Sequence, residues 1–360
     1  MPANNVLNAN DPASIEKAAQ VLKTGGIVAF PTETVYGLGA DASNPLAVAK
    51  VFEAKKRPQF DPIIVHVASV DEALPLWQNT PKVALELMKR FWPGPLTLVL
   101  PKTDRIPDIV TAGLPTVAVR MPENKIALKL IQLLERPIAA PSANVFGYTS
   151  STTAEAVSED FGDKVDLILD AGATRIGIES TVLKIEKDHG VLLRPGGAAM
   201  EAIEKIIHVV KHSGQAKEIV ESPGQMQSHY APWTNFSLMG SPFGDFVDEL
   251  RGIQKLFQQK KVNWPRIGLL VFGRRDLLKT EEGMHLFEIV EDLSPSKDLR
   301  EAAANLFQSL RKLDKMNLDI LIAEAIPERD LGLAIMDRLR KAAASHVEIR
   351  EYLKNLMERA

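Results

Sequence analysis

The segment GGIVAFPTETVYGLGADA, residues 25–42, decides how the first half of the chain can fold. Gly25 and Gly26 end a helical pattern, and the apolar run 27–30 that follows is predicted to form a strand. Pro31 interrupts that strand, and hydroxyl groups, a carboxylate and two further glycines come directly after it. Because ligands of α/β proteins often bind where strands end, the segment is a candidate binding site.

Two other interpretations of this segment stay open. Residues 37–42 satisfy the loose dinucleotide pattern G-x-G-x-x-G/A, but Pro31 interrupts the approach and residues 43–45 delay the helix that should open there. The other interpretation is a turn with exposed hydroxyl groups. The motif alone does not decide between them.

Apolar periodicity predicts a mixed α/β domain of about 200 residues around this segment. One helix is expected over residues 15–22 with Ser14 as N-cap, and a second over 46–54 after Asn44 and Pro45. Further strands are predicted at residues 63–67, 96–100, 117–120, 138–140, 167–170, 181–185 and 191–194. Further helices are predicted at residues 82–90, 126–134, 154–161 and 199–211.

A second, smaller domain is predicted after a linker. Residues 213–234 are rich in Gly, Pro, Ser and Gln, with little apolar periodicity. Beyond them, strands 267–272 and 320–323 alternate with helices at 298–313 and from Leu333, which indicates an α/β layer with a parallel sheet. A length of 360 residues also favours two domains.

Composition excludes several classes of protein. With no cysteine, the chain cannot form disulfides, thiolate nucleophiles or Cys-containing zinc sites. A net charge of −3 gives no global basic field, so strong direct binding to nucleic acid is not expected. No apolar run is long enough for a membrane span, and the polar N-terminus does not look like a secretion signal. We therefore expect a cytoplasmic protein that does not bind membranes.

Three cations come shortly before a histidine. Lys55, Lys56 and Arg57 are predicted to end a helix, and the strand at 63–67 carries His66. A solvated charged face is one interpretation. The other is that the cations and the imidazole converge on one anionic ligand.

Arg120 ends the alternating strand predicted at 117–120. Its planar guanidinium suits bidentate capture of a carboxylate, although a surface ion pair would use the same residue. Ser142, Asn144 and Ser150 follow a later strand, where hydroxyl and amide groups can donate hydrogen bonds to phosphate oxygens. A plain turn remains the alternative for that segment.

Two further segments add polar groups. Ser180 and Arg194 contribute a hydroxyl and a cation, which is weak evidence alone. Tyr230 lies in the expected linker, where an aromatic ring is unusual, so the segment is either a lid over a site or packed against a domain.

Taken in order, these segments resemble the threonylcarbamoyl-adenylate synthase family in its two-domain form. The motifs are PTETVYGLGADA, KKRP, PIIVHV, WPGPLTLVL, TVAVRMP, PIAAPSAN, IESTVL and LLRPGG, with SHYAPW and IPERDLGLAIMDRLRKAA towards the C-terminus. The resemblance covers nearly the whole chain. It implies a YrdC-like catalytic domain with a twisted mixed sheet at residues 1–210, a linker or lid at 211–235, and a smaller Rossmann-like α/β domain at 236–360.

The resemblance also implies a reaction and its substrates. L-threonine, bicarbonate and ATP would be condensed into threonylcarbamoyl-AMP with release of pyrophosphate, for downstream proteins that transfer the threonylcarbamoyl group to adenosine in tRNA. No residue would act as a nucleophile, and Mg²⁺ would accompany ATP, with its protein ligands unknown. By resemblance, the threonine contacts would be Thr32, His66, Arg120, Ala140 and Ser180. The ATP contacts would be Lys55, Lys56, Arg57, Thr116, Ser142, Asn144, Ser150, Arg194 and Tyr230, with the choice between Lys55 and Lys56 open.

Two rival functions are alternatives to this resemblance. A binding module for structured RNA would need a basic concave surface, which the acidic overall balance disfavours. A related enzyme that activates carbamoyl phosphate, as in hydrogenase-maturation proteins that share this fold, would need additional zinc-finger and acylphosphatase-like domains. Without cysteine a Cys-based zinc finger cannot form.

Overall fold

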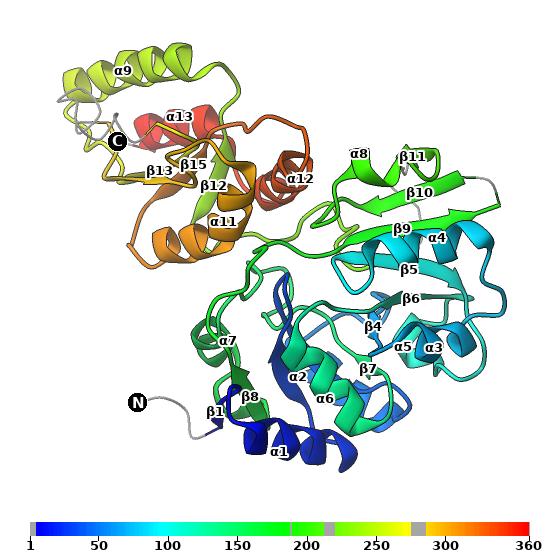
Figure 1. Cartoon of the computed structure of the whole chain (residues 1–360). Helices are drawn as coiled ribbons and strands as arrows, with labels where there is room; N and C mark the ends of the chain where they lie inside the picture. The colour runs from blue at the N-terminus through cyan, green and yellow to red at the C-terminus, as the bar shows by residue number, and fades with distance from the viewer. Residues whose placement is uncertain (1–4, 188, 212–219, 275–285, 360) are drawn as a thin grey trace. The chain divides into compact units, whose positions relative to one another are not determined.

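The computed structural model describes residues 5–187, 189–211, 220–274 and 286–359. They form two compact units (Figure 1). The first consists of Met1–Phe146 and Ser150–Met226, and the second of Gly147–Thr149 and Gln227–Ala360. Part of the expected linker, residues 212–219, lies outside the described residues.

The first unit is built on one mixed sheet. Over the described residues its strand order is β1-β8-β2-β3-β7-β4-β6-β5-β9-β10-β11, with parallel and antiparallel neighbours. The strands are β1 (Val6–Asn8), β2 (Val28–Pro31), β3 (Tyr36–Asp41), β4 (Val65–His66), β5 (Leu96–Pro101), β6 (Thr116–Arg120), β7 (Ile138–Ala139), β8 (Leu167–Asp170), β9 (Thr181–Glu186), β10 (His189–Arg194) and β11 (Val209–Lys211). The predicted mixed α/β fold is confirmed.

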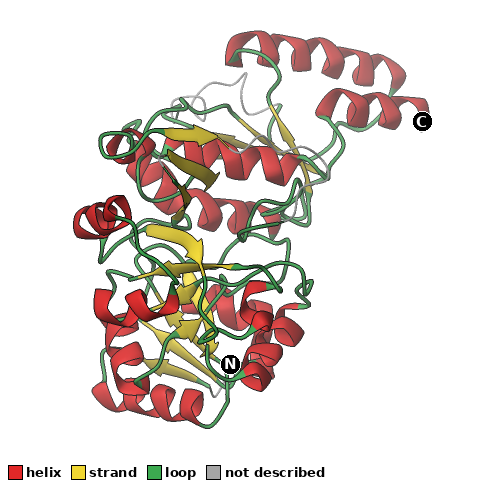
Figure 2. Ribbon diagram, turned by 90° about the vertical axis from the view of Figure 1, so that its right-hand side faces the viewer, coloured by secondary structure: helices red, strands yellow, loops and turns green. Residues whose placement is uncertain are grey.

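Helices flank this sheet on both sides (Figure 2). They are α1 (Pro12–Lys23), α2 (Pro45–Lys55), α3 (Val70–Ala73), α4 (Lys82–Phe91), α5 (Asp108–Thr111), α6 (Lys125–Leu134), α7 (Ala154–Phe161) and α8 (Met200–Ile203), with 3₁₀ turns at Leu74–Leu76 and Gly162–Lys164.

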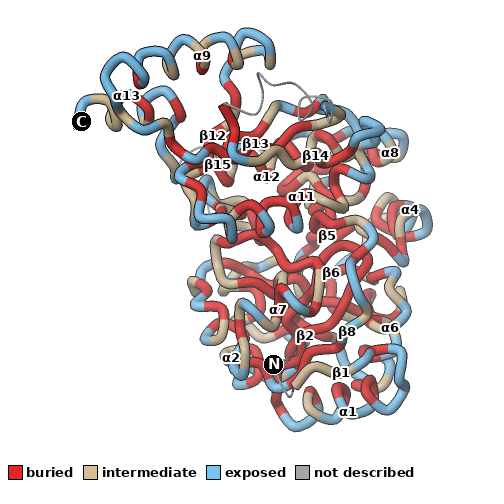
Figure 3. Tube along the Cα trace, turned by 90° about the vertical axis from the view of Figure 1, so that its left-hand side faces the viewer, coloured by how far each residue is buried: buried red, intermediate tan, exposed pale blue. Residues whose placement is uncertain are grey.

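Strand β2 shows why both faces of the sheet need covering. Ala29 and the adjoining Ile27 enter one apolar cluster, whereas Val28 and Phe30 enter the cluster that contains α1 and α6. Side chains alternate between the two faces of a strand, so an all-apolar run supplies both layers of the core. The tube in Figure 3 is accordingly buried along the central strands of the first unit.

Two local predictions were wrong, and two of the alternatives left open are excluded. Helix α1 is capped by Asp11, whose Oδ1 accepts from the Ala13 amide at 3.0 Å, because Pro12 rather than Ile15 opens the helix. Residues 209–211 form strand β11 beside β10 and do not continue a helix. The glycine-rich residues 36–41 form the buried strand β3, antiparallel to β2, which excludes both the dinucleotide turn and the exposed turn.

The second unit is a four-stranded sheet over the described residues, in the order β12-β15-β13-β14. Its strand pairs are all parallel, which confirms the predicted parallel sheet. Its strands are β12 (Asn235–Leu238), β13 (Ile267–Val271), β14 (Ile289–Asp292) and β15 (Ile320–Ala323). Its helices are α9 (Phe243–Lys260), α11 (Leu299–Asp314), α12 (Gly332–Ala343) and α13 (Ile349–Arg359). In the described parts of the chain, none of the helices has the length and apolarity that crossing a membrane requires.

Asp314, the last residue of α11, organises one end of the second unit. Its carboxylate accepts hydrogen bonds from the hydroxyl of Tyr148 at 2.8 Å and from the amides of Trp233 and Thr234 at 3.0 and 2.7 Å. The Tyr148 ring stacks on Trp233 at 5.2 Å, and the Arg311 guanidinium lies 4.7 Å from the centre of that ring. Residues 147–149 are thereby part of the second unit although their neighbours in sequence belong to the first.

We predict that Asp314→Ala lowers the free energy of unfolding by about 1–3 kcal/mol, because two backbone amides and a phenol lose their acceptor. Chemical denaturation would measure this. Asp248→Ala is the matched control, since that carboxylate forms only an exposed surface ion pair with Arg251 and should change stability by less than about 0.5 kcal/mol. Equal effects of the two substitutions would contradict the structural role of Asp314.

Candidate active site

A buried polar turn follows β2. The Thr32 hydroxyl donates to the carbonyl of Val35 at 2.6 Å and lies 2.8 Å from the hydroxyl of Thr34. Every residue from 31 to 42 is buried. Hydroxyl groups removed from water need partners, and this turn supplies them internally.

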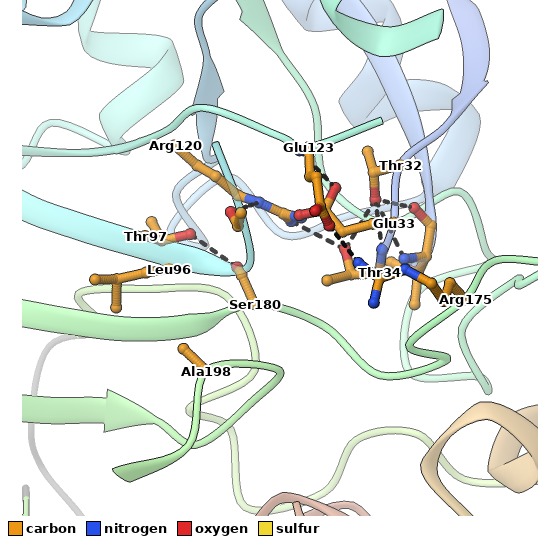
Figure 4. Close-up of polar contacts among 12 residues, drawn as sticks. Thr32, Glu33, Thr34, Leu96, Thr97, Arg120, Glu123, Arg175, Ser180 and Ala198 are labelled. Atoms are coloured by element: carbon orange, nitrogen blue, oxygen red, sulfur yellow. Dashed lines mark hydrogen bonds and ion pairs between the residues drawn. The ribbon is translucent and has the colours of Figure 1, made fainter. Parts of the chain in front are cut away.

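Arg120 lies at the end of β6 and reaches the same turn (Figure 4). Its Nη2 donates to Glu33 Oε1 at 2.5 Å and its Nη1 to Thr34 Oγ1 at 2.9 Å, while Nε donates to the Gly94 carbonyl at 3.2 Å. The residue is 3% exposed. A surface ion pair, the alternative left open by the sequence, is therefore excluded.

His66 and Ala140 lie on neighbouring strands beside Arg120. His66 of β4 pairs with Arg120 of β6, and Ala140, just after β7, donates its amide to the Ile64 carbonyl at 3.0 Å. Burial, and then the positive charge of Arg120, lower the pKa of His66 to about 3. The imidazole is therefore neutral at physiological pH.

Ser180 and Arg194 are joined directly. Arg194 Nη2 donates to the carbonyl of Ser180 at 3.0 Å and to its hydroxyl at 3.3 Å. The Ser180 hydroxyl also lies 2.8 Å from that of Thr97, a fully buried residue of β5 to which the sequence had assigned no chemistry. A predicted threonine contact and a predicted ATP contact thus share a hydrogen bond.

The cation cluster after α2 is divided between the interior and solvent. Lys55 is 1% exposed, and its Nζ donates to the carbonyls of Ser142 and Asn144 at 2.6 and 2.5 Å. Burial, followed by the charge of Arg57, holds the pKa of Lys55 well below its ordinary value. Lys56 is exposed and ends the helix with a φ of 52°. Lys55, not Lys56, is the lysine at the 142–144 segment.

Arg57 and Ser150 each have a buried acidic partner. Arg57 lies 2.8 Å from the carboxylate of Asp61, and Ser150 donates a hydrogen bond to Glu179. Both acidic residues are less than 5% exposed. The sequence did not identify Asp61 or Glu179 as members of the site. A local sequence pattern does not distinguish a buried carboxylate from one at the surface.

Thr116 lies away from these groups within the first unit, and Tyr230 belongs to the second unit. Thr116 is the first residue of β6 and Arg120 the last, so about 13 Å of strand separates them. Thr116 lines a different cavity, of about 510 Å³. Tyr230 belongs to the second unit, where its ring lies 5.8 Å from Phe307 and 4.9 Å from the Arg338 guanidinium. Their roles in ATP binding remain predictions.

A metal ion has few protein ligands available. Over the residues that the structure describes, no three His, Asp or Glu side chains gather into a possible metal site. Hard oxygen ligands near the candidate ATP contacts include the hydroxyl of Ser150 and the carboxylates of Glu179 and Asp61. Such a donor set fits Mg²⁺ bound chiefly through substrate phosphates and does not fit a cage made only of protein ligands.

Comparisons with known proteins cover both units. The Sua5, YciO and YrdC family, described as telomere recombination, matches residues 20–196, and the C-terminal domain of threonylcarbamoyl-AMP synthase matches residues 198–344. The threonylcarbamoyl-AMP synthase of Pyrococcus abyssi is 44% identical over 348 residues, covering 95% of this chain and 98% of that protein. The Bacillus subtilis enzyme of that name is 45% identical over 348 residues, covering 95% and 96%.

Solved structures agree with these matches. The crystal structure of P. abyssi Sua5 complexed with L-threonine has a TM-score of 0.82 and 43% identity, covering 93% of this chain and 95% of that one. A variant of P. abyssi Sua5, with a neighbouring histidine and tyrosine replaced by alanine, gives 0.84 and 41%, covering 95% and 97%. The fold and the matches define the class, a two-domain α/β transferase that forms an adenylate. The chain belongs to the threonylcarbamoyl-AMP synthase family.

The neutrality of His66 predicts a pH dependence of stability. The folded-state pKa, about 3, lies below the unfolded value of about 6.5, so the unfolded state binds more protons between these values. The stability from this group is complete above pH 6.5 and is lost as the pH falls towards 3, by up to about 1.4 kcal/mol per pH unit. His66→Gln removes the titration. Denaturation between pH 7 and 5 should show a steeper loss for the wild type, and parallel curves would contradict the prediction.

Proposed function

We propose that this chain condenses L-threonine, bicarbonate and ATP into threonylcarbamoyl-AMP and pyrophosphate in the first unit. The relatives that carry the name of this activity are 44% and 45% identical over nearly the whole chain, and a solved relative binds L-threonine. The structural observation that carries the proposal is the hydrogen bonding of Arg194 to Ser180. It brings a candidate nucleotide contact against a candidate amino-acid contact, which joining two substrates requires.

On the threonine side, Arg120 binds the carboxylate through its planar fork, within the wall formed by Thr32, Ala140 and Ser180. A buried arginine is well suited to this because it stays charged and offers donors in a fixed plane. His66 can hydrogen-bond the substrate without adding a second positive charge, since its pKa of about 3 keeps it neutral.

The reaction needs no nucleophile from the protein. Bicarbonate loses hydroxide to give carbon dioxide, and the threonine amine attacks its carbon, forming an N–C bond as one C=O π bond opens to a carbamate oxygen. The proton that the amine loses combines with the hydroxide to give water. A carbamate oxygen then attacks the α-phosphorus of ATP, a new O–P bond forms, the bond to the β-phosphate oxygen breaks and pyrophosphate leaves. The chain contributes positioning and fixed charge.

On the nucleotide side, Lys55 and Arg194 supply positive charge, and Ser142, Asn144 and Ser150 supply hydrogen bonds. A polyphosphate beside Lys55 favours its protonated form and so opposes the effect of burial on its pKa. Mg²⁺, when bound with ATP, neutralises phosphate charge. The oxygens of Ser150, Glu179 and Asp61 are groups of this chain that would be available to hold it.

The wider setting follows from the product. An acyl adenylate hydrolyses readily, so we expect Tyr230 and its segment to shield it from water. We also expect that a cytoplasmic protein consumes it by transferring the threonylcarbamoyl group to adenosine in tRNA. A variant of the P. abyssi relative lacks a neighbouring histidine and tyrosine. His229 and Tyr230 are such a pair in this chain.

Pyrophosphate release from ATP should require threonine and bicarbonate together, because the attacking carbamate exists only when both are present. A coupled pyrophosphate assay with each substrate omitted in turn measures this, and mass spectrometry identifies the adenylate. Release at an unchanged rate without either substrate would refute the assignment.

Arg120→Lys should weaken threonine binding by about tenfold or more while ATP affinity changes less than twofold, since the charge stays and the two-pronged donor is lost. Calorimetry with each substrate separates the two effects. Arg175→Lys is the matched control, because that guanidinium is 68% exposed and pairs with Glu123 at the surface. If the substitution weakened ATP binding and left threonine binding unchanged, the assignment of Arg120 to the threonine side of the pocket would be wrong.

A further inference from the structure

Glu33 is a buried carboxylate beside the candidate threonine contacts that has no assigned role. It is 4% exposed, and its two oxygens have different partners (Figure 4). Oε1 accepts from Arg120 Nη2 at 2.5 Å, and Oε2 accepts from the backbone amide of Glu123 at 3.0 Å. The side chain therefore ties the Arg120 guanidinium to the backbone three residues further along the chain.

This bridge requires a carboxylate. Both partners of Glu33 are donors, so both side-chain oxygens must accept. Glutamine has nearly the same shape but one amide nitrogen, which would point a donor at either Arg120 or the Glu123 amide. Aspartate keeps the charge but is one methylene shorter, so it cannot span the same two groups without movement. The backbone of Glu33 is held independently, because its carbonyl accepts from the Ile176 amide at 2.8 Å.

The bridge leaves Arg120 with capacity for a substrate. A guanidinium has five N–H groups. Glu33, Thr34 and Gly94 each accept from a different nitrogen of Arg120, which fixes the plane of the group. These three contacts use three of the five N–H groups, so one N–H on each terminal nitrogen is left for a substrate carboxylate.

We propose that Glu33 is a positioning residue that orients the Arg120 fork for the substrate carboxylate and balances its charge while the pocket is empty. The proposal rests on the proposed function, in which Arg120 binds that carboxylate. Glu33 acts through Arg120 and the backbone at 123, and it does not contact ATP. Its effect is therefore specific to threonine.

A purely structural role gives a different pattern. Breaking a buried ion pair lowers stability whether or not Arg120 binds substrate. Lost stability alone would reduce the amount of folded enzyme, and the KM values of both substrates would then remain unchanged. Separate KM values for threonine and ATP distinguish the two roles.

The experiment uses the full chain with Glu33→Gln, and with Glu33→Asp as the variant that keeps the charge. We expect the KM for threonine to rise at least tenfold for Glu33→Gln and less for Glu33→Asp, with the KM for ATP within twofold of the wild type in both. Calorimetry of threonine binding should show the same ratios. Glu123→Gln is the matched control, because it leaves the backbone amide that binds Glu33 in place, and its threonine KM should stay within twofold.

A double substitution tests whether Glu33 acts through Arg120. Once Arg120→Lys has removed the fork, adding Glu33→Gln should change the threonine KM by less than threefold, so the two effects are not additive. Additive effects, an equal rise in both KM values, or an unchanged threonine KM in Glu33→Gln and Glu33→Asp would each overturn the proposal. If Arg120→Lys itself left threonine binding unchanged, the proposed function of the pocket would be at fault.

Discussion

The buried charge of Arg120 is the constraint on which the first unit depends. An isolated guanidinium inside a protein is costly, and it is tolerated only when a counter-charge and hydrogen bonds replace water. Glu33, Thr34 and the Gly94 carbonyl supply these, and they come from separate parts of the chain. The end of β6, the turn after β2 and the segment before β5 must therefore meet in one arrangement.

The same principle organises the rest of the site. Arg57 pairs with Asp61, Lys55 is held by two backbone carbonyls, and Arg194 by the carbonyl of Ser180. Each cation is held by a partner within the protein. Groups that do not reorganise during the reaction stabilise developing charge more effectively than mobile ones. A site with this many fixed cations suits chemistry in which a carboxylate and a polyphosphate are brought together.

Many residues of the candidate site can be proposed from the sequence because they stand in distinctive motifs. Arg120 in TVAVRMP and Ser180 in IESTVL were identified, and the structure places both in the buried polar region. Glu33 and Thr97 were missed although they lie inside quoted motifs. Their roles depend on which groups from other strands face them, and Glu33 of PTETVYGL meets Arg120 only across 87 residues of sequence. No local pattern contains that information.

Local patterns in the sequence suffice to predict the class of fold, the two-unit order and the parallel sheet of the second unit, because apolar periodicity and chain breakers act over a few residues. Only tertiary structure decided which of two adjacent lysines is internal, that residues 36–41 form a strand, and that residues 147–149 belong to the second unit. Each of these depends on burial and on partners distant in the chain. Whether a carboxylate or an amine is a surface group or part of a site depends on whether the surrounding residues exclude water from it.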